Sequence, residues 1–261
     1  MSLTDLEVLT QTELGGLKVQ PVSDIPPHVN MLIYGDPGVG KTVLAGSASV
    51  VERMAPVLVI DIEGGTLSLK GTYPHVDIVR VETWKDMQQV YDALYDGKHG
   101  YNTVVLDSLT EIQKFSMYLI MGDLIKSDPS RDPDIPGMRE WGKNIEQIRR
   151  LIRAFRDLPI NTVVTALAKQ DRDVRTGMTK TTPSLSGKLA NEVAGFLDIV
   201  MYMYTKIVNK DGETEFMRLL LTQPTDTQVA KDRTGRLPQV VEQPTMQGLV
   251  DCIFETDTGA T

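Results

Sequence analysis

Short apolar runs rich in β-branched residues alternate with helical patterns along most of the chain. The runs span Met31–Tyr34, Val57–Ile62, Val76–Val81, Thr103–Leu106, Thr162–Ala166, Ile199–Tyr204 and Met217–Leu221. The first five are short, continuous and bounded on both sides, as parallel strands buried on both faces are. They therefore predict the strands of a buried parallel sheet.

One segment between two of these runs has the pattern of an amphipathic helix. Its apolar residues recur at steps of three and four positions, which places them on one face of a helix. They are Met138, Trp141, Ile145, Ile148, Ile152 and Phe155. Because strands alternate with helical segments, we expect an α/β fold in which a mainly parallel sheet carries helices on both faces.

The last two runs are joined by a polar segment, Asn209–Gly212, that contains Asp-Gly. This dipeptide favours the tight turn of a β-hairpin, so the two runs predict an antiparallel hairpin at one edge of the sheet. A chain of 261 residues suits a single domain of this kind. We expect an N-terminal arm over residues 1–20, with a short helix near Thr4–Leu14, a core over residues 21–254 and a disordered tail over residues 255–261.

Composition and charge narrow the functional classes. The net charge is −8, so no global basic field attracts nucleic acid, and any contact with DNA needs a local basic patch. Cys252 is the single cysteine, which excludes an intramolecular disulfide and suits a reducing cytoplasm. The three histidines lie far apart, so we expect no zinc site. Neither a signal peptide nor a membrane-spanning segment is expected, and membranes are not predicted partners.

A glycine-rich loop follows the first strand and leads into a helix. It consists of Gly35-Asp36-Pro37-Gly38-Val39-Gly40-Lys41-Thr42, and Val43 continues the helix. The glycines allow backbone N–H groups to turn toward phosphate oxygens. In this pattern Lys41 reaches the β- and γ-phosphates, and the Thr42 hydroxyl holds Mg²⁺. The loop predicts ATP and Mg²⁺ binding; the alternative is a glycine-rich turn with an incidental Lys-Thr.

Two acidic residues complete a candidate ATPase site. Asp107 ends the run Thr103–Leu106 and is placed to orient Mg²⁺ through water or Thr42, although it could instead cap the following helix. Ser108 stands where many AAA+ ATPases place a catalytic glutamate. Glu63, after the run Val57–Ile62, is therefore our candidate general base or water-positioning residue. The alternatives are an exposed turn acid for Glu63 and a turn cap for Asp61.

A GTPase interpretation fits the same region less well. Asp61-Ile62-Glu63-Gly64 matches D-x-x-G, and Ala168-Lys169-Gln170-Asp171 approaches the guanine-reading motif N-K-x-D. However, Asp61 follows Lys41 by only 20 residues, too few for a switch region and an intervening strand. Ala168 also replaces the asparagine that reads the base.

The segment 169–188 is a candidate contact for single-stranded DNA. It holds five lysines and arginines against two aspartates, within an acidic chain. Its threonine, glycine and proline content predicts a mobile loop rather than an element. Flexible cations and hydroxyl groups are what backbone phosphates need, and we assign Arg172, Arg175, Lys180 and Lys188 to DNA binding. The segment offers no aromatic residue for base stacking, and a solvated surface loop is the alternative.

Together with Trp141-Gly142 and the basic pair Lys231-x-Arg233, these motifs resemble phage-encoded RecA-like nucleotide-binding proteins, including Sak-type single-strand annealing proteins that consist of a minimal RecA core. The resemblance covers roughly residues 20–254. It implies that Lys231 and Arg233 act in trans on a neighbouring subunit's ATP, in a homo-oligomeric ring or filament. Relatives often carry a polar γ-phosphate sensor after the strand that corresponds to Thr162–Ala166; here Thr165 or Lys169 is the available substitute.

Family membership implies an ATP-hydrolysing protein of the bacterial host cytoplasm that binds single-stranded DNA and assists strand annealing in recombination, with a single-strand-binding protein as a further partner. Two other functions stay open from the residues alone. One is a motor or loader ATPase that acts on a protein partner, in helicase loading or packaging. The other is a nucleotide-binding scaffold without hydrolysis, against which Glu63 and the basic pair argue.

Overall fold

The computed structural model describes residues 13–15, 17–21, 28–172, 177–210 and 213–254. The predicted tail 255–261 and most of the predicted arm 1–20 lie outside these residues. Among residues 1–20, Glu13–Leu14 (β1) and Leu17–Lys18 (β2) pair as a small antiparallel sheet. Glu13 and Leu14 are therefore in a strand, not in the helix that we expected near Thr4–Leu14. The other positions of that expected helix are not among the described residues.

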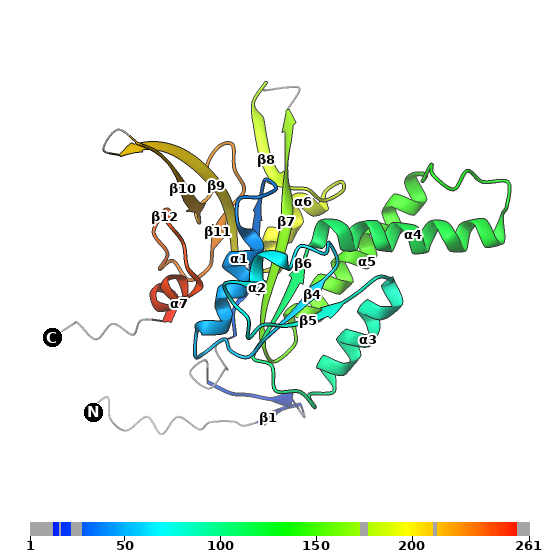
Figure 1. Ribbon diagram of the computed structural model, residues 1–261. Helices are drawn as coiled ribbons and strands as arrows, with labels where there is room; N and C mark the ends of the chain where they lie inside the picture. Colours follow the sequence, from blue (N-terminus) through cyan, green and yellow to red (C-terminus); the bar gives the residue numbers. More distant parts are fainter. Residues whose placement is uncertain (1–12, 16, 22–27, 173–176, 211–212, 255–261) are drawn as a thin grey trace, which may run out of the picture.

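The rest of the described chain forms one large sheet flanked by helices (Figure 1). The strands are β3 (Asn30–Gly35), β4 (Val57–Asp61), β5 (Asp77–Arg80), β6 (Thr103–Asp107), β7 (Asn161–Arg172), β8 (Thr179–Pro183), β9 (Ile199–Lys210), β10 (Glu213–Leu221), β11 (Lys231–Asp232) and β12 (Val240–Glu242). The helices are α1 (Lys41–Gly46) with a 3-10 turn η2 (Ser47–Val50), α2 (Leu67–Lys70), α3 (Trp84–Tyr95), α4 (Leu109–Ser127), α5 (Met138–Arg156), α6 (Leu189–Phe196) and α7 (Met246–Phe254).

The strand order confirms the predicted α/β architecture. It is β12-β10-β9-β3-β7-β6-β4-β5, with β11 beside β9 and β8 beside β7. Neighbours from β9 to β5 are parallel, whereas β10 and β12 form an antiparallel edge. β3, β4 and β6 are buried at every position, as their uninterrupted apolar sequences predict. β9 belongs to both parts, since it pairs in parallel with β3 and antiparallel with β10.

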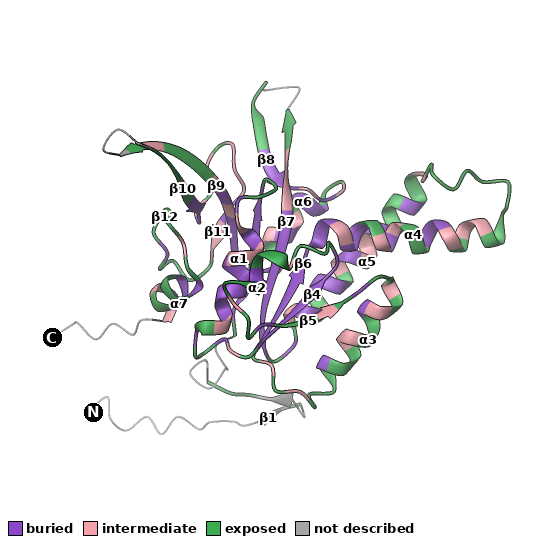
Figure 2. Cartoon of the chain, in the orientation of Figure 1, coloured by how far each residue is buried: buried purple, intermediate pink, exposed green. Residues whose placement is uncertain are grey.

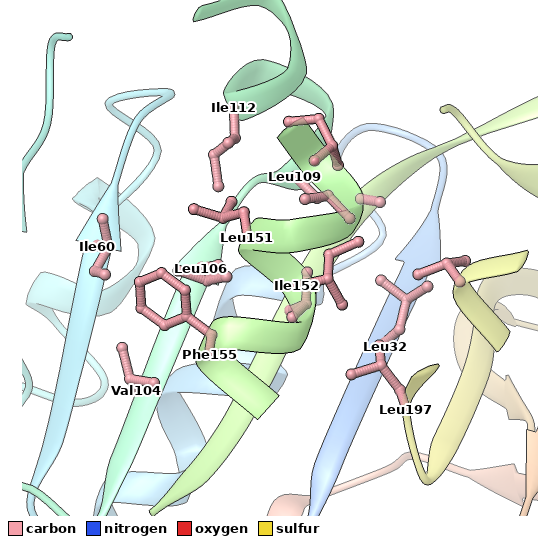
Figure 3. Packing of buried hydrophobic residues seen from close by; sticks show 14 of the residues in the cluster. Leu32, Ile60, Val104, Leu106, Leu109, Ile112, Leu151, Ile152, Phe155 and Leu197 are labelled. Atoms are coloured by element: carbon pink, nitrogen blue, oxygen red, sulfur yellow. The ribbon is translucent and has the colours of Figure 1, made fainter. Parts of the chain in front are cut away.

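The alternation of side chains along β3 divides the core into two layers. Leu32 and Tyr34 join a cluster with residues of α3, α4, α5 and α6, whereas Met31 and Ile33 join one with residues of α1, α2 and α7. Figure 2 shows the buried positions running along the sheet between these layers. Figure 3 shows Phe155 of α5 lying across the strands near Val104 and Leu106.

α4 and α5 extend together beyond the sheet (Figure 1). Ser116 Oγ donates to Gln147 Oε1 at 2.6 Å, and Asn144 Nδ2 donates to the Gln113 carbonyl at 2.9 Å, so polar contacts join the two helices. Among the described helices, these included, none has the length and apolar content that crossing a bilayer requires.

Within the segment 169–188, residues 169–172 and 179–183 form strands, so the expectation of a loop rather than a regular element was wrong for these residues. The first six residues of β7 are buried, and its last three are exposed. Its last five residues pair antiparallel with β8, from Ala168 opposite Pro183 to Arg172 opposite Thr179. Figure 1 shows this β-hairpin, here called the arm, rising clear of the sheet. The threonines that suggested a loop are β-branched and suit a strand, and the arm satisfies its backbone groups through its own ladder.

Replacement of Phe155 tests the layer beneath α5. Phe155 has no solvent exposure, so Phe155→Ala should lower the free energy of unfolding by about 3–5 kcal/mol through lost apolar contact and a residual cavity. Leu67→Ala is the control, because Leu67 is 81% exposed and its loss should change stability by no more than about 0.5 kcal/mol. Urea unfolding followed by circular dichroism measures both. Equal effects of the two variants would contradict the packing described here.

Candidate active site

The glycine-rich loop Gly35–Thr42 joins the end of β3 to the start of α1, and its backbone requires glycine at specific places. A Cβ on Gly35 would lie 2.2 Å from the Met203 carbonyl oxygen of β9, closer than any real contact. Gly40 has a φ of 107°, in the left-handed region that other residues rarely adopt. The loop can therefore turn its amide groups inward at the start of α1, where phosphate oxygens bind.

Lys41 is folded over this loop and is only 9% exposed. Its ammonium donates to the carbonyls of Gly35 at 3.1 Å and Asp36 at 2.8 Å. Burial lowers the pKa of Lys41, and the carboxylates of Glu63, Asp107 and Asp36 partly oppose this shift. The β- and γ-phosphates of a nucleotide would add negative charge and favour the protonated amine. Of the other predicted loop positions, Asp36, Pro37 and Gly38 are exposed, Val39 is buried and Val43 is half-buried.

Thr42 and Asp107 meet at the end of the sheet as a pair of oxygen donors. The Thr42 hydroxyl donates to Asp107 Oδ2 at 2.8 Å, and Asp107 is only 2% exposed. Mg²⁺ bound with a nucleotide takes one or two protein oxygens and completes its shell with phosphate and water. The pair fits that ion, and within the described part of the chain no larger group of acidic, histidine and cysteine ligands competes for it.

Thr165 of β7 holds the Asp107 carboxylate from its other side. The Thr165 hydroxyl donates to Asp107 Oδ1, and Thr165 has no solvent exposure. It is therefore placed to orient Asp107 rather than to touch a γ-phosphate, the role for which the sequence made it a candidate. Lys169, the other candidate sensor, forms an ion pair with Asp171 at 3.0 Å. In the sequence, this contact is indicated only by a threonine within the apolar run Thr162–Ala166 and by the aspartate that ends the run Thr103–Leu106.

Glu63 is exposed in the turn after β4 and accepts a hydrogen bond from the Ser108 hydroxyl. Asp61 forms this turn, since its carboxylate accepts from the Gly64 amide at 2.8 Å and from the Thr66 hydroxyl at 3.2 Å. The structure thus gives Asp61 the turn-capping place that sequence analysis left open. It also brings Glu63 to the residue that follows Asp107, beside the phosphate loop, where an attacking water could be held.

Arg218 of β10 is a neighbour of the loop that the sequence did not single out. Its Nε donates to the Val39 carbonyl at 3.2 Å, and a Cβ on Gly40 would lie 3.1 Å from the same nitrogen. Arg218 therefore supports the outer side of the loop. An arginine within the apolar run Met217–Leu221 was a signal that pattern analysis could have used.

The basic pair Lys231 and Arg233 is bound within its own chain. Lys231 Nζ donates to the carbonyls of Ala194 at 2.7 Å and Leu197 at 2.8 Å, at the end of α6. Burial lowers the pKa of Lys231, and the nearby charge of Arg233 acts in the same direction. Arg233 forms an ion pair with Asp198 at 2.7 Å. A role in a neighbouring subunit would require both side chains to leave these partners.

The predicted DNA-binding residues do not form one group. Arg172 and Lys180 are exposed on the arm, in neighbouring pairs of its ladder. Lys188 is exposed at the start of α6, separate from the arm. Arg175 lies outside the described residues.

A comparison with protein-family models identifies the sequence family of the chain. The family model described as "AAA domain" matches residues 28–234, most of the chain. The match runs from the residues before β3 to the segment of Lys231 and Arg233, and it includes the glycine-rich loop, Asp107 and the arm. No curated protein matches the chain in sequence.

Removal of the Thr165 hydroxyl tests its action on Asp107. Thr165→Val keeps the shape of the side chain but leaves Asp107 with one hydrogen bond fewer, so Mg²⁺-dependent ATP turnover should fall roughly 10- to 100-fold, as for other groups that orient a metal ligand. Thr162→Val is the matched control, because Thr162 is buried in the same strand but donates to the Phe155 carbonyl at 2.9 Å. Steady-state turnover across Mg²⁺ concentrations measures both, and equal loss in the two variants would contradict the assignment.

Proposed function

The chain belongs to the AAA domain family of P-loop ATPases, and we propose that it couples ATP hydrolysis to the binding of single-stranded DNA during strand annealing and recombination. The observation that carries this proposal is the double role of β7. Its buried half bears Thr165, which holds Asp107, and its exposed half forms the basic arm. One continuous strand therefore joins the candidate Mg²⁺ ligand to the candidate DNA contact.

The residues of the candidate site have separate roles in ATP hydrolysis. The loop amides and Lys41 hold the phosphates, while Thr42 and Asp107 offer the oxygens that would hold Mg²⁺. The ion, when bound, supplies charge neutralisation on the β- and γ-phosphate oxygens. Glu63, kept at the site by Ser108, orients a water molecule and accepts its proton.

The arm supplies cations without base-reading chemistry. Arg172 and Lys180 are exposed along a ladder that projects from the sheet, and backbone phosphates require little more than such charges. A projecting strand pair also suits an extended ligand. This supports binding to single strands irrespective of their sequence, as an annealing protein needs.

Assembly into a ring or filament belongs to the same proposal. The resemblance to phage-encoded annealing proteins implies head-to-tail contacts in which Lys231 and Arg233 reach a neighbour's nucleotide. Phage origin and a single-strand-binding protein as partner rest on that resemblance alone.

Turnover with and without DNA tests the proposed function directly. At low ionic strength, single-stranded DNA should raise ATP hydrolysis by the purified protein. Glu63→Gln should lower the rate of ATP turnover by about 10²-fold or more, the range for loss of a general base, and nucleotide should still bind. Unchanged turnover, with no retention of DNA in the presence of ATP, would favour a motor or loader that acts on a protein partner.

Neutralisation of the arm tests its role in DNA binding. The triple variant Arg172→Gln, Arg175→Gln and Lys180→Gln should bind single-stranded DNA more weakly and with a shallower salt dependence, by about 0.7 in log–log slope for each lost phosphate contact. Its affinity for ATP should not change. The triple variant Lys70→Gln, Lys85→Gln and Lys98→Gln changes the net charge equally at exposed positions away from the arm. If both variants bind DNA alike, the arm is not the contact. Fluorescence anisotropy measures both.

A further inference from the structure

A partly aromatic pocket lies at the base of the arm, beyond the candidate active site. It has a volume of about 370 Å³, and α4, α5, the end of β7 and the turn after β8 supply its walls. Ligand pockets typically range from about 300 to 1,000 Å³, so this one can hold a nucleobase with its sugar. None of the nucleotide-loop residues contributes to it.

Two exposed aromatic side chains from different helices line this pocket. Tyr118 of α4 is 69% exposed and Trp141 of α5 is 39% exposed. The contacts between α4 and α5, such as Asn144 to the Gln113 carbonyl, fix this arrangement. Large aromatic side chains that remain accessible in a hollow are typical of binding sites, because their burial by a ligand is favourable. The two rings supply the stacking surface that the arm itself lacks.

Two lysines complete the lining. Lys169 of β7 pairs with Asp171 at 3.0 Å, and Lys114 of α4 pairs with Glu111 at 2.6 Å. Both pairs are partly exposed to solvent and contribute little free energy, so either ammonium can exchange its carboxylate for a phosphate. Lys169 also lies on the same face of the arm as Lys180, because Lys180 pairs with Asp171, two residues from Lys169 on β7. One cation of the arm therefore shares a face with the pocket.

The polar groups of the pocket are already engaged with one another. Gln113 Nε2 donates to the Ser186 hydroxyl, and the Ser186 amide donates to Gln113 Oε1 at 3.1 Å. The Thr110 hydroxyl accepts from the Leu167 amide at 3.0 Å. These groups are not directed at a ligand's hydrogen-bonding edge. The pocket thus offers ring faces and positive charge, which suit any base irrespective of its identity.

We propose that this pocket takes one unstacked base of single-stranded DNA, stacked on Trp141 and flanked by Tyr118, with the adjoining phosphates held by Lys169 and Lys114. The inference rests on the proposed function and names the subsite through which DNA is held. A duplex supplies this ligand only after a base is unpaired and unstacked, so single strands are the favoured partner. An apolar side chain from a second copy would fill the space but would bring no negative charge to the two lysines.

The pocket also borders the catalytic side of the nucleotide site. Thr110 in its wall lies in the first turn of α4, two residues after Ser108, which donates to Glu63. The pKa of Lys114 is raised chiefly by the hydrogen bond that Lys114 donates to Glu111, and the Glu63 carboxylate makes the smallest of the contributions. A base in the pocket would press on the helix turn adjacent to the Glu63 contact. DNA stimulation of ATP turnover should therefore depend on Trp141.

The chain's two tryptophans, Trp84 and Trp141, allow a direct test. The Trp84→Phe variant leaves Trp141 as the single tryptophan, whose emission can be excited selectively over that of the tyrosines. Titration with a thymidylate oligomer of about 20 residues, longer than the roughly 4–16 nucleotides that a single-strand-binding fold covers, should quench its emission. Trp141→Ala should weaken binding of the oligomer on the order of tenfold, as loss of one stacked base does, whereas Trp141→Phe should retain most of the affinity.

Tyr95→Ala is the matched control, because Tyr95 is 71% exposed on α3, away from the pocket, and its loss should leave DNA affinity unchanged. If wild type binds the oligomer by anisotropy but Trp141 emission and Trp141→Ala affinity do not change, the pocket proposal is wrong while the proposed function stands. If wild type does not bind the oligomer, both are wrong. If Trp141→Ala instead dissociates a homo-oligomer of the protein and leaves DNA affinity unchanged, the pocket proposal is wrong and the pocket binds a second copy of the chain.

Discussion

The buried carboxylate of Asp107 is the group on which the rest of the site depends. An ionised carboxylate that is almost completely buried is stable only with hydrogen-bond donors and nearby positive charge. Thr42 supplies one donor from α1 and Thr165 the other from β7, while the Lys41 ammonium provides the charge. The carboxylate therefore fixes the start of α1 against two strands of the sheet. Any ligand that changes the partners of Asp107 acts on all three elements together.

A second contact joins the same parts from the opposite side. Tyr34 lies on β3 immediately before Gly35, the first residue of the loop, and its hydroxyl donates to the Val229 carbonyl at 2.6 Å. The Thr181 carbonyl of β8 lies 3.3 Å from the same oxygen. Burial raises the pKa of Tyr34, so the hydroxyl keeps its proton and remains a donor throughout the physiological range. The nucleotide loop, the base of the arm and the segment before Lys231 thus converge on one side chain. Coupling between ATP and the arm is expected along packed strands rather than through a mobile loop.

The sequence could predict those parts of this arrangement that a local pattern of residues determines. Uninterrupted apolar runs located the central strands, and glycine spacing located the phosphate loop. The arm was missed because a polar, threonine-rich strand that leaves the core has neither the apolar run nor the alternation that marks a strand. Thr165 and Asp107 are 58 positions apart, and Arg218 is 179 positions from Val39, so these contacts arise only from strand order. Likewise, Tyr118 and Trp141 share a pocket because two helices pack together, which no local pattern records.

The basic pair illustrates how own-chain contacts limit an assignment made from motif alone. Lys231 donates to two carbonyls at the end of α6, where the helix dipole favours a cation. Each hydrogen bond that involves a charged group contributes about 1.5–3 kcal/mol. Arg233 is more than half exposed, and its pair with Asp198 contributes no more than about 1 kcal/mol. A neighbour's phosphates would therefore draw Arg233 away at a much lower cost than Lys231. In an assembly, Arg233 would therefore be the better placed of the two to contact a neighbouring subunit, whereas Lys231 connects α6 to β11.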